Sequence, residues 1–287
     1  MHCASGTLPF TSPVPLIATV HDVAWLRVQQ HARAYARAYF GAFALARYAR
    51  ARALFVDSEF SRLELLALAK VDPARLVVLY PGVANDIMRV ARAPGETPTL
   101  LAVGTVEVRK NLELLVRVIA AVPGVRLISV GPFTPYRERV LALANELGVA
   151  ERVELRGYVT RDVLLELYRS ATLAAVPSHY EGFGYGAAQA LCAGLPLVAA
   201  NAASLPEIVV DGAPLVGPRD LAGWVDAVRA ILEARDAAEQ RAARARPAAC
   251  ARLGWAASAA LAEATYRAVL AGRLPSFDGE VRRRCGP

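Results

Sequence analysis

The sequence predicts an α/β protein built on parallel sheets, and two observations support this prediction. Between about residues 99 and 216, short apolar runs alternate with segments of helical periodicity. Near-continuous apolar strands that alternate with amphipathic helices are typical of a parallel sheet covered on both faces. In the first 97 residues, three more apolar runs have the length and composition of strands. A chain of 287 residues that is 55% hydrophobic can bury the core of one large or two modest domains.

The second region supplies most of the expected elements. Residues 206–211 are expected to form a loop or short turn, and Pro247 is expected to interrupt a helix because proline cannot donate a backbone hydrogen bond. Strands are expected at residues 99–105, 125–131, 153–159, 173–178 and 196–201, with helices between them and further helices at 220–235, 236–252 and 255–271.

The first region is expected to form a partial domain. Its strands are predicted at residues 15–22, 53–58 and 76–83, and the proline-containing segment 91–98 is the candidate linker. A stand-alone α/β domain usually needs on the order of 100–150 residues, more than this region holds. The expected organisation is therefore a partial domain at 1–95, a complete domain at 96–272 and a loose tail at 273–287.

A basic, aromatic-bearing helix is predicted at residues 31–52. We favour an ordinary domain helix, and peripheral contact with an anionic membrane is the alternative, since a basic amphipathic helix can lie on such a surface. The side chains behind this alternative are Arg33, Arg37, Arg47, Arg50 and Arg52, with Tyr35, Tyr39, Phe40 and Phe43.

Composition narrows the class of protein. The formal net charge of +7 is compatible with phosphorylated ligands, an anionic membrane or nucleic acid. The sequence lacks zinc-finger spacing, a basic segment joined to heptads and an aromatic RNA-binding signature, so we expect no nucleic-acid partner. The four cysteines are scattered without a C-x-x-C pair, which indicates reduced thiols rather than a metal site. With no signal-peptide pattern at the printed start, the expected location is the cytoplasm, with the inner face of the membrane as an option.

The most informative stretch is EGFGYGAAQALCAG at residues 181–194. Gly182 and Gly184 permit backbone geometries and close ligand approach that a Cβ atom would prevent. A helix is expected to begin near Tyr185, and the N-terminus of a helix favours phosphate. Glu181 would repel a phosphate, so its expected partner is a neutral hydroxyl such as that of a sugar. The alternative is a solvated acid before an ordinary helix.

The same stretch also fits G-x-G-x-x-A, a dinucleotide-binding fingerprint. Three residues separate the expected strand from Gly182, whereas the fingerprint follows its strand directly. We therefore disfavour a nicotinamide enzyme.

A second stretch, VGTVEVRKNLELL, places two cations after a predicted strand. Gly104 and Thr105 end the strand, and Arg109 and Lys110 follow before a helix. Cations at this position are suited to a diphosphate, although a solvated surface pair is the favoured interpretation of this motif alone. Ligands bind beyond the carboxyl ends of parallel strands, so this loop and residues 131–135 and 178–184 are expected to share one rim. His21 ends a strand in TVHD, where a capped core histidine is an equal alternative, and Asp57 and Ser58 form a plausible helix N-cap.

Taken in order, these motifs resemble the retaining, nucleotide-sugar-dependent glycosyltransferases of family 4, often called group 1 glycosyltransferases. The resemblance runs from about Leu8 to Leu270, and it implies a GT-B architecture of two Rossmann-like domains with the donor in the cleft between them. The stretches that carry it are TVHDV, VDSEFSR, YPGV, VGTVEVRKN, VELRGYV, SHYEGFGYGAAQALCAGLPLVA, SLPEIV and a late GW.

The resemblance also implies roles for single residues. Arg109 and Lys110 would hold the donor diphosphate, Glu181 would contact sugar hydroxyls, and His21 would approach the sugar from the first domain. No metal or other cofactor is expected, because the cations and the helix end take the charge of the leaving diphosphate. The remaining donor-binding positions are Gly104, Thr105, Val159, Gly182, Phe183, Gly184, Tyr185 and Gln189.

Two departures from the family matter. The family carries a second acid in an E-x7-E pattern that grips the ribose, and here that position is Gln189. The loss of a charged acceptor would weaken nucleotide binding by roughly 1–2 kcal/mol, and weakened but retained activity is our expectation. The second departure is that HCASGTLPF, residues 2–10, resembles the middle of the family's first domain. Either the true start lies upstream or the chain is a fragment, and a first domain truncated in this way is expected to be poorly soluble or associated with a partner.

The expected function follows from the resemblance. It is transfer of a hexose of mannose or glucose type from a GDP- or UDP-sugar to a saccharide or lipid-linked acceptor, with retained configuration and a slight preference for a GDP-mannose-type donor. The alternative is a truncated or degenerate relative that binds a nucleotide sugar without catalysis.

Overall fold

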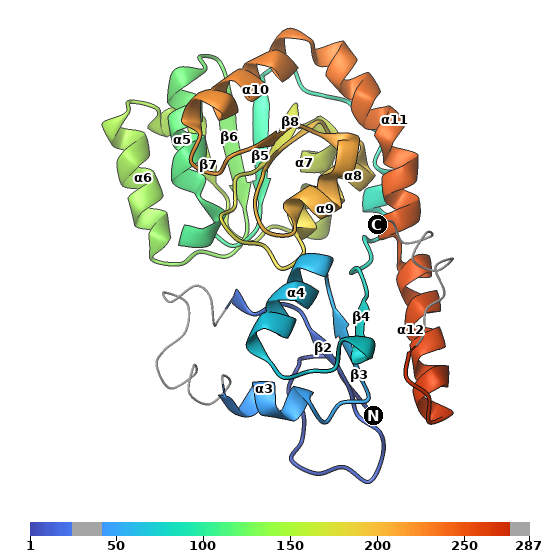
Figure 1. Cartoon of the computed structure of the whole chain (residues 1–287). Coiled ribbons are helices and arrows are strands. Elements are labelled where there is room, and N and C mark those ends of the chain that lie inside the picture. The colour runs from blue at the N-terminus through green and yellow to red at the C-terminus, as the bar shows by residue number, and fades with distance from the viewer. Residues whose placement is uncertain (25–41, 276–287) are drawn as a thin grey trace. The chain divides into compact units, whose positions relative to one another are not determined.

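The computed structural model describes residues 1–24 and 42–275 of the chain (Figure 1). Residues 31–41 of the predicted helix at 31–52 and residues 276–287 of the predicted tail lie outside the described residues. The contacts divide the chain into two compact units, each of which is described by itself. The first comprises Met1–Gly82, Glu181–Phe183 and Arg252–Pro287, and the second comprises Val83–Tyr180 and Gly184–Ala251.

The first unit is built on a four-stranded parallel sheet in the order β1-β2-β3-β4. The three predicted strands appear as β2 (Ile17–Val20), β3 (Ala53–Val56) and β4 (Leu76–Val78), while β1 (His2–Cys3) was not foreseen. The α-helices among the described residues of this unit are α3 (Ala42–Tyr48), α4 (Glu59–Leu68) and α12 (Trp255–Leu270).

Alternation along β3 sends side chains to two cores. Leu54 and Val56 join a cluster with Leu65 of α4, and Phe55 joins a second cluster with Leu261 and Val269 of α12. A strand that is buried on both faces reads as a continuous apolar run, as ALFV does.

The contact-defined units differ from the domain boundaries predicted above. Residues 83–95 group with the second unit, and α12 groups with the first instead of with residues 96–272. Trp255 packs directly over Gly82, where an added Cβ would lie 2.3 Å from the indole ring. The Ser258 hydroxyl donates to the Tyr80 carbonyl at 2.6 Å. α12 belongs to the first unit because its apolar residues cover one face of that sheet.

The second unit holds a six-stranded parallel sheet in the order β10-β9-β8-β5-β6-β7. The five predicted strands all form, although each is shorter than expected, and the two-residue strand β10 was not foreseen. Their bounds are β5 (Thr99–Val103), β6 (Arg126–Val130), β7 (Val153–Leu155), β8 (Leu173–Val176), β9 (Leu197–Ala200) and β10 (Leu215–Val216).

Helices pack beside one another around this sheet. α5 contacts α6 and α10, and α8 contacts α7 and α9 (Figure 1). Leu205–Val209 form the short helix α9, which overlaps the segment 206–211 predicted as a loop or short turn. The bounds are α5 (Leu112–Ala121), α6 (Tyr136–Glu146), α7 (Arg161–Ser170), α8 (Tyr185–Ala193), α9 (Leu205–Val209), α10 (Leu221–Glu233) and α11 (Arg235–Leu253).

The predicted interruption at Pro247 is wrong, because α11 runs through it. Proline removes one helical hydrogen bond, but packing on both sides of it keeps the helix intact. Ala242 and Ala249 are buried, and Arg246 donates to the Met88 carbonyl at 2.5 Å.

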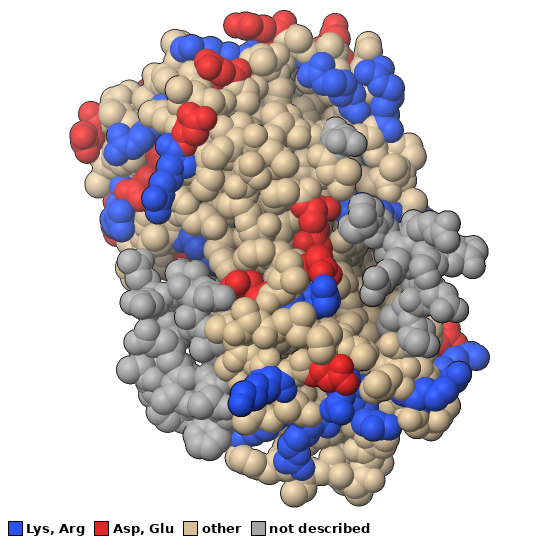
Figure 2. All heavy atoms as spheres, viewed as in Figure 1, with Lys and Arg blue, Asp and Glu red and all other residues tan. Residues whose placement is uncertain are grey.

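Charged side chains of both signs are interspersed on the face drawn in Figure 2. Ion pairs among the described residues include Arg139 with Glu113 and Arg169 with Glu166. None of the described helices combines the length and apolar character needed to cross a bilayer.

Candidate functional site

The strand order of the second unit creates a topological switch point between β5 and β8. From β5 the chain moves outward through β6 and β7, then returns to the other side of β5 and moves outward through β8, β9 and β10. In open α/β sheets, ligands bind at the carboxyl ends of the strands where the order reverses. The loops after β5 and β8 carry the two sequence motifs singled out above, so the fold places both motifs at this point.

Hydrogen bonds tie these two loops together. The Arg109 carbonyl accepts from the backbone N–H of His179 at 2.8 Å. The Arg109 guanidinium donates to the Tyr180 carbonyl at 3.1 Å and forms an ion pair with Glu107 at 2.7 Å. Arg109 therefore braces the loop that leads into Glu181, and an acid of the chain already balances its charge.

Lys110 lies at the end of β5. Gly104 has a φ of +144°, and a Cβ there would lie 3.3 Å from Cε and 3.4 Å from Nζ of Lys110. A Cβ on Gly131 would lie 2.2 Å from the Gly104 carbonyl oxygen and 3.1 Å from the Thr105 nitrogen. These glycines let the ends of β5 and β6 approach, and they place the ammonium group of Lys110 over the turn.

The start of α8 packs against the same strand end. Gly184 is its N-cap with a left-handed φ of +91°, and Tyr185 is its first helical residue, as predicted. A Cβ on Gly186 would lie 3.0 Å from the Val103 carbonyl oxygen, which explains the third glycine of GFGYG. The positive end of the α8 dipole thus lies at the switch point, where it favours an anion.

Gln189 is held inside the second unit. Its side chain is only 5% exposed, and its Oε1 accepts a hydrogen bond from the Tyr168 hydroxyl of α7 at 2.9 Å. Burial raises the pKa of Tyr168, so this hydroxyl stays a donor at all ordinary pH values. The position expected to face a ribose is therefore engaged by a buried tyrosine.

The loop after β7 lies at the same edge of the sheet, where it is hydrogen-bonded to the residue that follows β6. The Gly157 carbonyl accepts from the Gly131 N–H at 2.8 Å. Tyr158 projects outward with 88% of its surface exposed, while Val159 is half-buried beside it. Val159, predicted to bind the donor, thus follows β7, which is separated from β8 by β5 and β6.

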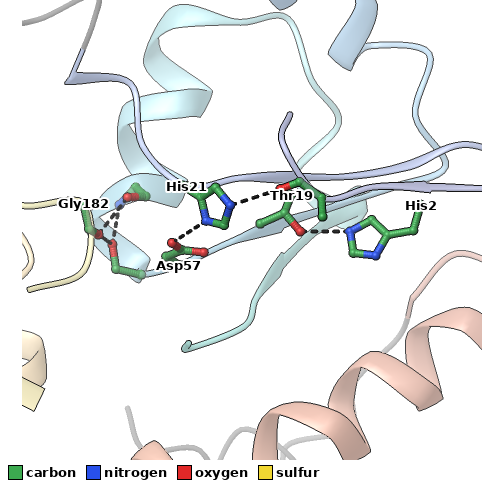
Figure 3. Close-up of polar contacts among 8 residues, drawn as sticks. His2, Thr19, His21, Asp57 and Gly182 are labelled. Atoms are coloured by element: carbon green, nitrogen blue, oxygen red, sulfur yellow. Dashed lines mark hydrogen bonds and ion pairs between the residues drawn. The ribbon is translucent and has the colours of Figure 1, made fainter. Parts of the chain in front are cut away.

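The remaining predicted residues belong to the first unit. His21 follows β2, and its Nδ1 lies 2.9 Å from Oδ2 of Asp57, which follows β3 (Figure 3). Its Nε2 lies 3.0 Å from the Ala4 carbonyl oxygen. The hydrogen bond to Asp57 is the main cause that raises the pKa of His21, whereas burial raises the pKa of Asp57 against the effect of its histidine partner.

The turn Glu181–Phe183 packs onto the same end of the first unit. The Gly182 carbonyl accepts hydrogen bonds from the hydroxyls of Ser58 and Ser61, the latter at 2.9 Å (Figure 3). The Phe183 ring lies 5.8 Å from that of Tyr80, and Glu181 is 5% exposed.

The two glycines of the turn make room for the chain itself. A Cβ on Gly182 would lie 2.5 Å from Cβ of Asp22 and 2.9 Å from the His21 carbonyl oxygen. A Cβ on Gly184 would lie 2.7 Å from Cδ2 of Leu205. The close approach predicted for a ligand is thus occupied by protein atoms at both positions.

Asp57 is the site residue that sequence reasoning missed. The sequence predicted a helix N-cap at Asp57 and Ser58, and Ser58 alone fills that role by accepting from the Ser61 N–H at 2.9 Å. A signal was available in the strand ends: Val20 of β2 pairs with Val56 of β3, so the next residues, His21 and Asp57, emerge side by side. Among the described residues, no group of three His, Cys, Asp or Glu could hold a metal ion.

Comparisons with known proteins agree with one another on the family. A family profile described as "Glycosyl transferases group 1" matches residues 83–248. The D-inositol 3-phosphate glycosyltransferase of Mycolicibacterium smegmatis is 36% identical over 204 residues, which cover 66% of this chain and 47% of that protein. Its counterpart in Mycobacterium avium is 33% identical over 219 residues, 70% of this chain and 51% of that protein. The chain spans about half the length of the curated relatives it matches.

Solved structures show the same fold. Sucrose-phosphate synthase from Thermosynechococcus elongatus superposes with a TM-score of 0.76 at 25% identity, covering 90% of this chain and 68% of that one. Anabaena Alr3699/HepE, solved with UDP-glucose, gives 0.74 at 20% identity, covering 88% and 72%. WaaG, a glycosyltransferase involved in lipopolysaccharide biosynthesis, gives 0.70 at 21%, covering 85% and 75%. The predicted α/β fold of GT-B type is thereby confirmed.

Proposed function

This chain belongs to the group 1 glycosyl transferases, and from that premise we propose that it transfers a hexose from a nucleotide diphosphate sugar to a saccharide or lipid-linked acceptor with retained configuration. The observation that carries the proposal is the switch point between β5 and β8, where Lys110 and the start of α8 lie at one strand end. A cation and a helix dipole together suit a diphosphate.

We assign roles to the remaining donor-binding residues from the chemistry of a sugar diphosphate. Glu181 accepts hydrogen bonds from sugar hydroxyls, and the backbone of residues 182–184 lines the sugar and phosphate. The bond between the anomeric carbon and the diphosphate oxygen breaks, and a bond to the acceptor hydroxyl oxygen forms on the same face. The acceptor proton passes to the leaving phosphate, so no protein base is needed at that step. Lys110 and the helix end stabilise the charge that develops on the diphosphate.

UDP- and GDP-sugars are both candidate donors. The HepE structures with UDP and UDP-glucose support the uridine donor, and the resemblance of VGTVEVRKN to donor-binding loops supports a GDP-mannose-type donor. The curated relatives are named for D-inositol 3-phosphate, which makes a phosphorylated cyclitol a further acceptor to test.

A non-catalytic nucleotide-sugar-binding protein is the second candidate function. The observation in its favour is Gln189, which stands where the family has an acid and which is bound by Tyr168. An amide in place of a carboxylate weakens the grip on a ribose by roughly 1–2 kcal/mol, which is a factor of about 5–30 in affinity. Binding without turnover would favour this candidate.

The test is calorimetric titration of the 287-residue chain with UDP, GDP and ADP. Lys110→Ala removes the proposed diphosphate contact, and Lys70→Ala is the matched control because Lys70 is the other lysine of the chain and is exposed. We expect saturable binding of one nucleotide, retained in the Lys70 variant and lost in the Lys110 variant. A folded sample that binds none of the three would overturn the proposed function. Turnover of the corresponding sugar nucleotide then separates the enzyme from the binding protein.

A further inference from the structure

We propose that Asp57 is a positioning residue that holds the His21 side chain as an imidazolium, so that His21 serves sugar binding at the turn Glu181–Phe183 as a cation and not as a general base. The inference deepens the proposed function and rests on it, because it gives His21 a defined task in sugar transfer. It concerns atoms that all lie within the first unit.

The geometry of the ring comes first. Nδ1 of His21 lies 2.9 Å from Oδ2 of Asp57, and Nε2 lies 3.0 Å from the Ala4 carbonyl oxygen (Figure 3). Both distances are those of ordinary hydrogen bonds. The Asp57 side chain is 10% exposed while that of His21 is 63% exposed, so the carboxylate is fixed in the interior and the ring presents an open face to solvent.

The number of protons follows from the two partners. A backbone carbonyl oxygen can only accept, and an ionised carboxylate can only accept as well. A neutral imidazole has one N–H, whereas an imidazolium has two. Two acceptors on the two ring nitrogens therefore require a doubly protonated ring. The shared proton resides on the imidazole because the ordinary pKa of histidine exceeds that of aspartate by roughly 2.6 units.

The charges around the ring agree with this assignment. The acids on the adjoining segments are Asp22 beside it in the chain, Asp57 after β3, Glu59 in α4 and Glu181 in the turn. Asp57 and Asp22 both raise the pKa of His21, and burial of the ring only partly opposes them. Among the described residues, no cation contributes to lowering the pKa of His21.

The position of the ring gives the cation a use. The carbonyl oxygen of His21 lies 2.9 Å from where a Gly182 Cβ would sit, so the strand end that carries the ring touches the turn 181–183. An imidazolium at this point attracts hydroxyl oxygen atoms of a sugar bound at that turn, and its Nε2–H can donate to one of them in place of Ala4. A ring with both nitrogens protonated cannot accept the proton of an attacking hydroxyl. Rotation of the ring is prevented because Asp57 holds Nδ1.

The first experiment measures protonation directly. In the full chain labelled with ¹⁵N at histidine, we follow the imidazole nitrogens by NMR from pH 5 to 9 and identify His21 with a His21→Gln variant. We expect two protonated nitrogens at pH 7 in the wild-type chain. Asp57→Asn should lower the pKa of His21 because it removes the main cause that raises it. Asp22→Asn, a control that deletes the same charge without the ring contact, should lower that pKa less.

The outcomes distinguish failure of this proposal from failure of the proposed glycosyltransferase function. A neutral His21 ring at pH 7 in the wild-type chain, or an equal effect of the two aspartate variants, would overturn the proposal whether or not the chain binds a nucleotide. The first of these outcomes is read on the wild-type chain, and the only variant that it needs is His21→Gln, which assigns the signals.

The second experiment measures turnover. With a sugar nucleotide that the chain turns over, Asp57→Asn should lower kcat roughly 10- to 100-fold with a smaller change in KM, as expected for loss of a hydrogen bond to a charged group. The alkaline limb of the pH profile should move to lower pH, since the cation is lost earlier. An unmoved pH profile beside a confirmed ion pair would limit Asp57 to a structural role and overturn the positioning role.

Discussion

The Ser58 hydroxyl donates to the carbonyl oxygen of Gly182, which lies 124 residues further along the chain. Ser58 also caps α4, and Ser61 on the next turn donates to the same carbonyl. One helix start thus holds the turn Glu181–Phe183, and the strand end just before it holds His21 through Asp57. Both elements proposed to meet the donor sugar depend on the short sequence VDSEFS.

Ser58→Ala should destabilise the chain more than Ser61→Ala. The first variant loses the helix cap and one hydrogen bond to Gly182, and cap loss costs about 0.5–2 kcal/mol. The second loses only its hydrogen bond to Gly182, for about 0.5–1.5 kcal/mol. Urea denaturation of the two variants measures the difference. Equal losses would show that the cap contributes nothing.

Gly182→Ala should disturb the turn by steric overlap. The new Cβ would lie 2.5 Å from Cβ of Asp22 and 2.9 Å from the His21 carbonyl oxygen, too close for either atom to remain in place. We expect a loss of about 1–3 kcal/mol in stability, typical of overpacking, and weaker nucleotide-sugar binding. Gly95→Ala is the control, since its Cβ would meet nothing closer than 3.8 Å and its effect should be small. Thermal unfolding and titration calorimetry of both variants check the prediction, and a Gly182 variant as stable as the control contradicts it.

Tyr168→Phe should leave the Oε1 atom of Gln189 without its hydrogen bond. Both side chains are buried, and an unsatisfied buried acceptor costs about 1–3 kcal/mol. Chemical denaturation gives the loss. Tyr158→Phe is the matched control because Tyr158 is 88% exposed, and its stability should stay within about 0.5 kcal/mol of the parent.

Gln189→Glu tests the departure from the family pattern. If this position binds a ribose, the restored carboxylate should tighten nucleotide binding by a factor of about 5–30. The comparison is the nucleotide affinity of the two chains by calorimetry. An unchanged or lower affinity would mean that the Tyr168 contact, and not a ribose, determines which residue stands here.

The His21–Asp57 pair should make stability depend on pH in a defined direction. The pKa of His21 is raised in the folded chain, mainly by Asp57, so the stabilisation from its cation is fully present below the ordinary pKa of about 6.5. It is lost as pH rises through the raised value. The free energy of unfolding should therefore fall over this interval in the wild-type chain and less steeply in Asp57→Asn. Parallel curves for the two chains would contradict the prediction.

The alternation of apolar runs and helical segments was sufficient to predict the sheet of the second unit, because each of its longer strands is buried on both faces. The strands β1 and β10 have two residues each, too few for any periodicity. The predicted interruption at Pro247 was wrong because packing on either side of the proline outweighed its local preference against a helix. The partner of His21 was missed because it lies 36 residues away and becomes a neighbour only through the pairing of β2 with β3. The roles predicted for residues at the donor site came from the order of the motifs along the chain. Contacts between residues do not by themselves identify such roles.

The return of α12 to the first unit has a consequence for the order of events on the ribosome. The sheet face that bears Ile17, Phe55 and Val77 is complete once β4 has emerged, but Leu261 and Val269, which cover it, are synthesised roughly 180 residues later. At about 5–20 residues per second, that apolar surface waits on the order of ten seconds or more for its cover. During translation it is open to chaperones and to other nascent chains until α12 has emerged.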